Sequence, residues 1–95
     1  MISVRVQLKG FLAWLVQNPD IAMTVRPGTT LSDLIVRLAV SSDDRLRNTI
    51  LNAAGHPDRS LGYALDRQAI AYPRLAHTTI ERDCRVTLFP LAAGG

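Results

Sequence analysis

The sequence predicts a single α+β domain in which one helix covers one face of a mixed sheet. Apolar and polar residues alternate at both ends of the chain, and this period of two is typical of half-buried strands. Residues 29–40 change to the 3.6-residue period of an amphipathic helix. The chain has 95 residues, of which 47% are hydrophobic and 20% charged, so its size and composition suit one globular domain.

Two strands are predicted near the start of the chain, at residues 2–8 and 21–26. The apolar positions of the first strand alternate with polar ones and are Ile2, Val4, Val6 and Leu8. Residues 11–20 connect the two strands and end in a turn-forming Asn-Pro-Asp sequence. We expect the two strands to pair antiparallel.

The main helix is predicted at residues 29–40. Thr30 is a suitable N-cap, and Asp33 can act as a short capping-box partner at the positive end of the helix. A shorter helix is predicted within residues 41–57, with Ser42 as its cap and a glycine and a proline as its stop signal. Its shared face is expected to consist of Leu46, Ile50 and Ala53.

The second half of the chain returns to the sheet. Strands are predicted at 61–65, more weakly at 69–72, and finally at 85–89, while residues 77–83 are expected to form one helical turn. If the last strand lies beside the first it must run parallel to it, because a helical crossover separates them. This order predicts a β-grasp fold with a mixed four- to five-stranded sheet, one main helix and a short second helix.

Composition excludes several classes of function. The net charge is +3, and the arginines that carry it are spread evenly and alternate with aspartates, so we expect no nucleic-acid binding. No apolar run approaches the roughly 20 residues that cross a bilayer, and the N-terminus lacks the pattern of a signal peptide. The sequence therefore predicts a cytoplasmic protein that does not bind membranes.

The sequence shows no pattern of a catalytic or metal site. Cys84 is the single cysteine, which excludes an internal disulfide and a multi-cysteine metal site, and it is expected to be a small buried residue. His56 and His77 lack metal-binding spacing, so no metal ligand is expected. Without a Ser-His-Asp, paired-carboxylate or phosphate-loop pattern, the chain is predicted not to be an enzyme by itself.

Three segments carry a resemblance to a known family, namely the opening ISVRVQL, the helix start PGTTLSDLIVRL and the ending RVTLFPLAAGG. Together they resemble the ubiquitin-like sulfur carriers of the MoaD/ThiS family, which are the small subunit of molybdopterin synthase and its relative in thiamine synthesis. The resemblance covers nearly the whole chain and is closer to the MoaD-like members, whose ending reads V-x-x-F-P-P-V-x-G-G. The matching residues are Val86, Phe89, Pro90, Gly94 and Gly95.

The chain departs from the family pattern at three places. Leu91 stands where a second proline is usual, which makes the ending less stiff. Cys84 occupies a position that is usually acidic. The segment 47–70 is longer than in the compact thiamine carriers and is similar to that of the extended molybdopterin-type members.

The resemblance implies a protein substrate that binds no cofactor of its own. An adenylating, E1-like activating enzyme would use ATP and Mg²⁺ to adenylate the Gly95 carboxylate. A persulfide sulfur would then displace AMP and leave a thiocarboxylate, which a sulfur-accepting synthase subunit would consume in molybdopterin or thiamine biosynthesis. We therefore expect a domain at 1–90 and a flexible tail at 91–95, where Gly94 and Gly95 are thin enough to enter a narrow channel.

Strand alternation predicts where these partners dock. The expected partner-binding residues lie on the open sheet face and at the start of the tail, and they are Arg5, Arg85, Thr87, Phe89, Pro90 and Leu91. Phe89 has two interpretations, as an interface anchor or as a residue that packs against a neighbouring loop. Trp14 is expected to close the end of the core together with Phe11 and Leu15.

Two other functions stay open at this point. The chain could be a non-catalytic β-grasp interaction module, in which the diglycine is unmodified and the open sheet face binds another protein. It could also be a ubiquitin-like modifier whose activated terminus acylates a lysine of a target.

Overall fold

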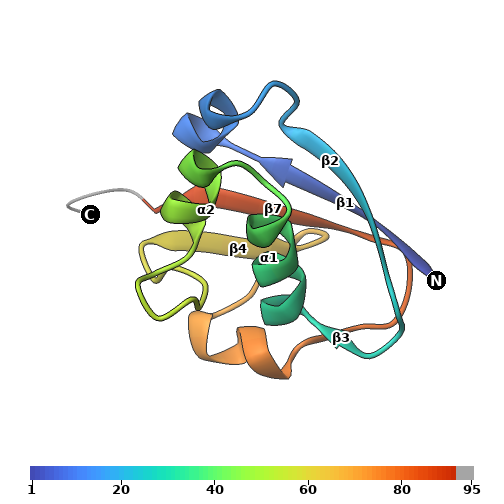
Figure 1. Ribbon diagram of the computed structural model, residues 1–95. Coiled ribbons are helices and arrows are strands. Elements are labelled where there is room, and N and C mark those ends of the chain that lie inside the picture. The colour runs from blue at the N-terminus through green and yellow to red at the C-terminus, as the bar shows by residue number, and fades with distance from the viewer. Residues whose placement is uncertain (92–95) are drawn as a thin grey trace.

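A computed structural model describes residues 1–91 and contains a five-stranded sheet with the helix α1 packed across one face (Figure 1). The strand order is β2-β1-β7-β4-β5. The strands of this sheet are β1 (Ile2–Leu8), β2 (Asp20–Val25), β4 (Leu61–Leu65), β5 (Gln68–Ala69) and β7 (Cys84–Pro90). A second, two-stranded sheet pairs β3 (Thr29–Thr30) with β6 (Thr79–Ile80).

The topology confirms the predicted β-grasp fold. Strand β1 pairs antiparallel with β2 and parallel with β7, so the last strand lies beside the first as expected. Strand β7 pairs antiparallel with β4 on its other side, which places it at the centre of the sheet. Because β1 and β7 run in the same direction, both end at the same edge of the sheet, opposite the N-terminus (Figure 1).

The main helix α1 (Leu31–Val40) begins directly after the predicted N-cap and buries the predicted face, whereas residues 29 and 30 form β3. Thr30 is the N-cap, and its Oγ1 accepts a hydrogen bond of 3.0 Å from the backbone N–H of Asp33. The face turned to the sheet follows the 3.6-residue period and consists of Leu31, Leu34, Ile35, Leu38 and Ala39. These side chains meet the apolar residues of β1, β7 and β4 in one core.

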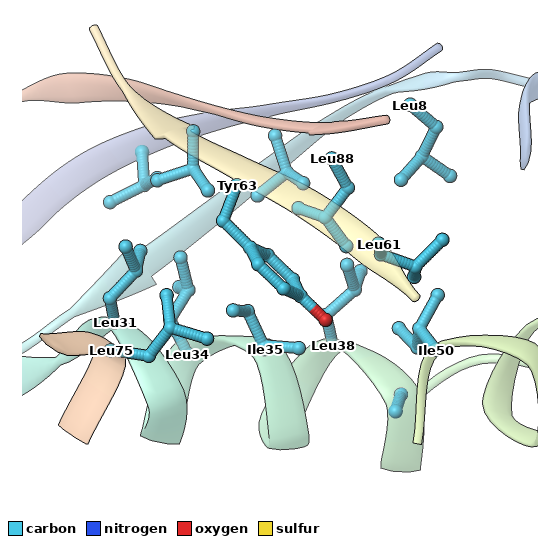
Figure 2. Close-up of a cluster of buried hydrophobic side chains, with 14 of the residues drawn as sticks. Leu8, Leu31, Leu34, Ile35, Leu38, Ile50, Leu61, Tyr63, Leu75 and Leu88 are labelled. Atoms are coloured by element: carbon cyan, nitrogen blue, oxygen red, sulfur yellow. The ribbon is translucent and has the colours of Figure 1, made fainter. Parts of the chain in front are cut away.

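Tyr63 is the largest side chain of that core. It projects from β4 between the strands and α1, toward Ile35 and Leu38 (Figure 2). Its hydroxyl donates a hydrogen bond of 2.8 Å to the carbonyl of Asp58, so the one polar atom of the ring has a partner. Burial raises the pKa of the Tyr63 hydroxyl far above its ordinary value.

The second helix, α2 (Asp44–Ile50), differs from its prediction at both ends. Asp43, not Ser42, is the N-cap, and its carboxylate accepts a hydrogen bond of 3.2 Å from the N–H of Leu46. The Ser42 hydroxyl donates instead to the Leu38 carbonyl at the end of α1. Because the backbone becomes extended after Ile50, Ala53 lies in an exposed loop and not on the buried face.

The segment after β5 also differs from its prediction. Pairing with β4 ends at Ala69, so the strand expected at 69–72 is two residues long. A 3₁₀ helix, η2 (Tyr72–His77), follows, and it tolerates Pro73 because a proline in the first turn of a helix loses no hydrogen bond. The helical turn expected at 77–83 is wrong. This segment contains β6, which pairs antiparallel with β3, the two residues directly before α1.

The connection at the end of β1 forms a 3₁₀ helix, η1 (Gly10–Leu15), and the prediction for its aromatic residues is wrong. Leu12 is the buried residue of η1, and the half-buried Leu15 packs against the same core as predicted. Trp14 is 87% exposed and Phe11 53% exposed, while Leu15 is half-buried. Leu12, and not Trp14, therefore closes this end of the core. Within residues 1–91, no helix has the length and apolar character needed to span a membrane.

The packing of α1 predicts a large effect of core truncation. Replacing the fully buried Ile35 by alanine should lower the free energy of unfolding by about 2–5 kcal/mol, because it removes apolar contacts and leaves a cavity. The measurement is urea denaturation followed by circular dichroism. The neighbouring Arg37→Ala is the control, since Arg37 is exposed and its loss should change the value by less than about 0.5 kcal/mol. Equal effects of the two substitutions would contradict the proposed core.

Candidate functional site

The open face of the sheet brings together four of the predicted partner-binding side chains. Arg5 on β1 lies beside Arg85 on the parallel strand β7. Thr87 and Phe89 follow along β7 on the same face, while the alternate residues Val86 and Leu88 are buried against α1. The predicted division of the sheet into two faces is therefore correct, and the binding role of these residues stays a prediction.

The two arginines carry like charges at adjacent positions, and one of them is held by a carboxylate. Arg5 binds Asp20 of β2 in a bidentate manner, with Nε–Oδ1 and Nη2–Oδ2 distances of 3.1 and 3.0 Å. Hydrogen bonding to Asp20, together with its charge, raises the pKa of Arg5 above its ordinary value. The ion pair is exposed, so it orients the Arg5 guanidinium more than it stabilises the fold.

Phe89 is half-buried because it packs on the backbone of the next strand. Its ring lies over Gly62 of β4, the residue opposite it in the ladder. A Cβ atom at Gly62 would lie 2.2 Å from Cε2 of this ring, so only glycine leaves room for it. Phe89 thus packs against a strand rather than a loop, and part of its ring stays open to solvent.

An apolar groove begins at the exposed edge of Phe89. It has a volume of about 390 Å³, and its lining includes Gly62, Ala69, Tyr72, Phe89 and Leu91. The Arg59 guanidinium lies 4.8 Å from the centre of the Tyr72 ring, within the range of a cation–π contact, and also borders the groove. The groove therefore offers a partner an apolar floor with one positive charge at its rim.

The end of β7 is held in place from two sides. Pro90 is itself the last residue of the strand, opposite Leu61, so pairing with β4 continues through the proline. The Leu91 N–H donates to the Ser60 carbonyl at 3.3 Å. On the other side, Gly10 has a φ of +57° and lies so close to Pro90 that a Cβ atom would be 2.7 Å from its Cγ.

Asp58 fixes the loop that supplies the Ser60 carbonyl. Its Oδ1 accepts hydrogen bonds from the Ser60 hydroxyl at 2.6 Å and from the Ser60 N–H at 2.8 Å. The side-chain hydrogen bond and then the backbone one lower the pKa of the Asp58 carboxyl below its ordinary value. Asp58 therefore positions Ser60, which in turn holds Leu91 where the tail begins. Gly94 and Gly95, the residues predicted to be activated, lie outside the described part of the chain.

Cys84 lies at the opposite end of β7 and is half-buried. Burial, followed by the charges of Asp66 and Asp83, raises the pKa of its thiol above the ordinary value. A reactive cysteine needs a lowered pKa, so this thiol does not suit a sulfur-relay role. Within residues 1–91, no group of three histidine, cysteine or acidic side chains is arranged to hold a metal ion.

Sequence reasoning missed two features of the site. The first is the contact between Gly62 and Phe89, although a glycine inside the strand pattern LGYAL is itself a signal of close approach. The second is the exposed pair Phe11 and Trp14, for which the sequence holds no clear signal. Apolar aromatic residues next to a predicted core favour burial, and only the position of η1 shows otherwise.

Comparisons with known proteins support the fold. Neither a protein-family model nor a curated protein sequence matches the chain. Among solved structures, SAMP1 from Haloferax volcanii has a TM-score of 0.80 and 20% identity, over 98% of this chain and 99% of that one. Small archaeal modifier protein 1 from Methanosarcina acetivorans has a TM-score of 0.80 and 16% identity, over 100% of this chain and 98% of that one.

A third similar structure has a different name. It is a putative molybdopterin converting factor, subunit 1, from Pyrococcus furiosus, with a TM-score of 0.73 and 12% identity, over 97% of this chain and 100% of that one. At these identities the likeness establishes a shared fold. The resemblance to the ubiquitin-like MoaD/ThiS proteins is therefore confirmed at the level of the fold.

The hydrogen bonds around Asp58 predict a measurable titration. The Asp58 carboxyl should titrate below the ordinary aspartate pKa of about 3.9, and Ser60→Ala should raise its pKa because the side-chain hydrogen bond is lost. A lowered pKa in the folded state means that this group stabilises the fold above its unfolded pKa. That contribution is lost as the pH falls through the folded value. The measurement is carboxyl-carbon NMR between pH 2 and 6, roughly the range over which aspartates titrate, and Ser41→Ala is a control without contact to Asp58. An unchanged Asp58 pKa in Ser60→Ala would contradict this arrangement.

The contact between Gly62 and Phe89 predicts energetic coupling. Gly62→Ala should lower the free energy of unfolding by about 1–3 kcal/mol, because the new methyl group displaces the Phe89 ring. In the double variant Gly62→Ala/Phe89→Ala the methyl group has room, so the two effects should not add. Urea denaturation of the wild type, both single variants and the double variant measures the coupling. Additive effects would show that the ring does not lie over Gly62.

Proposed function

We propose that the chain is a sulfur carrier whose working group is the Gly95 carboxylate. The observation that carries the proposal is that the central strand of a β-grasp domain ends at Pro90, and the sequence LAAGG follows it directly along the chain. An activating enzyme adenylates Gly95, and the outer sulfur of a persulfide displaces AMP to form an acyl disulfide. A second thiol then cleaves the S–S bond, becomes oxidised to a disulfide and releases the thiocarboxylate, whose sulfur passes to a sulfur-accepting synthase subunit. The proposed pathway is molybdopterin biosynthesis or, as the related case, thiamine biosynthesis.

The chemistry requires little of the chain beyond an accessible C-terminal carboxylate. A carboxylate is a poor electrophile until one of its oxygens becomes part of a good leaving group, which adenylation supplies. ATP and Mg²⁺ are used in the site of the activating enzyme, and the carrier contributes the acyl group. Ala92, Ala93, Gly94 and Gly95 have the smallest side chains or none, so a narrow channel can admit them.

The described residues support this role by fixing the point from which those four residues start. Leu91 is bound to Ser60, and Pro90 is enclosed between β4 and Gly10. Beside them, Phe89 and the groove offer an apolar surface for the partner. Ordering a tail costs roughly 1–2 kcal/mol per residue, and contacts on this rigid surface can offset that cost.

A second function follows from the names of two similar structures. One similar structure from Haloferax volcanii and one from Methanosarcina acetivorans are named small archaeal modifier protein 1. A modifier would use the same adenylated Gly95 to acylate a lysine of a target protein. The two functions share the first step and differ in the nucleophile, which is sulfur in one case and an amine in the other. The interaction module with an unmodified diglycine is the third alternative.

Intact-mass spectrometry tests the proposal. The chain is incubated with a candidate activating enzyme, ATP, Mg²⁺, a persulfide donor and a thiol reductant. We expect a gain of about 16 Da, because one sulfur atom replaces one carboxylate oxygen. A variant without Gly95 is the matched control and should gain nothing, since its new terminus no longer reaches the adenylation site.

The other outcomes identify the alternatives. A covalent adduct with a target lysine, and no gain from the sulfur donor, would favour the modifier. If the wild-type chain stays unmodified and still binds a partner after Gly94 and Gly95 are deleted, the carrier proposal is wrong and the interaction module takes its place.

A further inference from the structure

Two aromatic side chains stand exposed on η1, and the chemistry of the terminus does not use them. Trp14 is 87% exposed and Phe11 53% exposed. Side chains three residues apart in a 3₁₀ helix lie nearly one above the other, so both project from the same side of η1. We call these two residues the aromatic pair. Exposed aromatic side chains that stand together indicate an interaction surface.

The fold holds the aromatic pair close to the end of β7. The Lys9 N–H donates a hydrogen bond of 2.9 Å to the Leu88 carbonyl, and Leu12 anchors η1 in the core. Gly10, the residue before Phe11, is in contact with Pro90. Figure 1 shows η1 and the end of β7 at the same side of the molecule. The aromatic pair is therefore a fixed neighbour of the point where the tail begins.

The length of the remaining chain limits where its partner can be. Four residues follow Leu91, and at about 3.3–3.6 Å per residue they span at most about 14 Å. An enzyme that acts on Gly95 must place its surface within that distance of Leu91. Such a protein surrounds the start of the tail, and η1 borders that start through Gly10 and Pro90. The aromatic pair thus lies where the surface of the enzyme around the tail comes close to the domain.

We propose that the aromatic pair is a docking anchor for the adenylating enzyme that acts on Gly95. The inference rests on the proposed function and adds a second contact area, on the other side of β7 from the groove. Large aromatic side chains provide much of the binding free energy of interfaces when a pocket on the partner covers them. The anchor would hold the domain while the tail residues, which have little side-chain surface, occupy the channel.

A second copy of this chain is a poorer occupant. Two aromatic side chains bury roughly 150–250 Å² each, whereas a stable interface needs about 800 Å² on each partner. The aromatic pair alone is therefore too small for a stable dimer. An enzyme that also binds the tail and the surface around Pro90 can reach that area.

The test compares kinetic constants for the first step, the formation of the adenylate. ATP–pyrophosphate exchange is measured with the activating enzyme that produces the mass gain on the wild-type chain. Phe11→Ala/Trp14→Ala should raise the KM for the carrier about tenfold or more and leave kcat nearly unchanged, because the anchor does not touch the reacting atoms. The control is Thr24→Ala, an exposed residue at the far end of the sheet, whose KM should equal that of the wild type.

The outcomes separate this inference from the proposed function. Both aromatic side chains are exposed, so the urea midpoint of the double variant should match the wild type, and a KM change then reflects binding. If the wild type supports exchange and the double variant has the same KM, the anchor is wrong and the carrier function stands. If the wild type supports no exchange with any activating enzyme, both the carrier function and the docking anchor are wrong. If the KM of the double variant is unchanged but sedimentation shows that the wild type is a dimer and the double variant is not, the aromatic pair binds a second copy of this chain and the anchor is wrong.

A spectroscopic measurement shows contact without catalysis. Trp14 is the single tryptophan of the chain, so 5-fluorotryptophan gives one fluorine NMR signal. Adding the unlabelled activating enzyme should shift or broaden this signal, even in a variant that lacks Gly95. A signal that stays sharp and unshifted at saturating enzyme would overturn the inference.

Discussion

Strand β7 is hydrogen-bonded to β1 on one side and to β4 on the other, and the candidate site depends on this double pairing. It buries Val86 and Leu88 against α1 and turns Thr87 and Phe89 to the open face. A central strand cannot slip by one residue without moving its apolar side chains out of the core. The register of β7 therefore also determines where Leu91 emerges.

The contacts around Leu91 show how the domain fixes the point from which the last four residues start. Ser60 binds its N–H, Asp58 fixes Ser60, and Gly10 admits Pro90 at a distance that no other residue type allows. These contacts place two apolar surfaces on opposite sides of the exit, the groove and the aromatic pair. A partner that takes the tail meets both surfaces. In the proposed function the domain supplies binding and position, and the terminus supplies the reacting group.

Much of the fold could be predicted because its signals are local. Alternation in β1 and β7 and the 3.6-residue period of α1 identify elements whose buried faces coincide with their sequence pattern. The pairing of β3 with β6 could not be predicted, since two-residue strands carry no periodicity. The exposure of Trp14 could not be predicted either. Leu12 takes the core position, and nothing in the sequence of η1 indicates which of the two side chains is buried. For the site, alternation predicted the open face, while the stacking of Phe89 on Gly62 required the register between β7 and β4.

The central claim is that an activating enzyme converts the Gly95 carboxylate into an acyl adenylate. The most direct measurement traps this intermediate. The chain is incubated with the activating enzyme, ATP and Mg²⁺ without a sulfur donor, and hydroxylamine is then added, so that its nitrogen displaces AMP. Peptide fragmentation should locate a hydroxamate on the terminal carbonyl of Gly95 and nowhere else. An unmodified terminus, or a hydroxamate on an aspartate or glutamate side chain, would contradict the account.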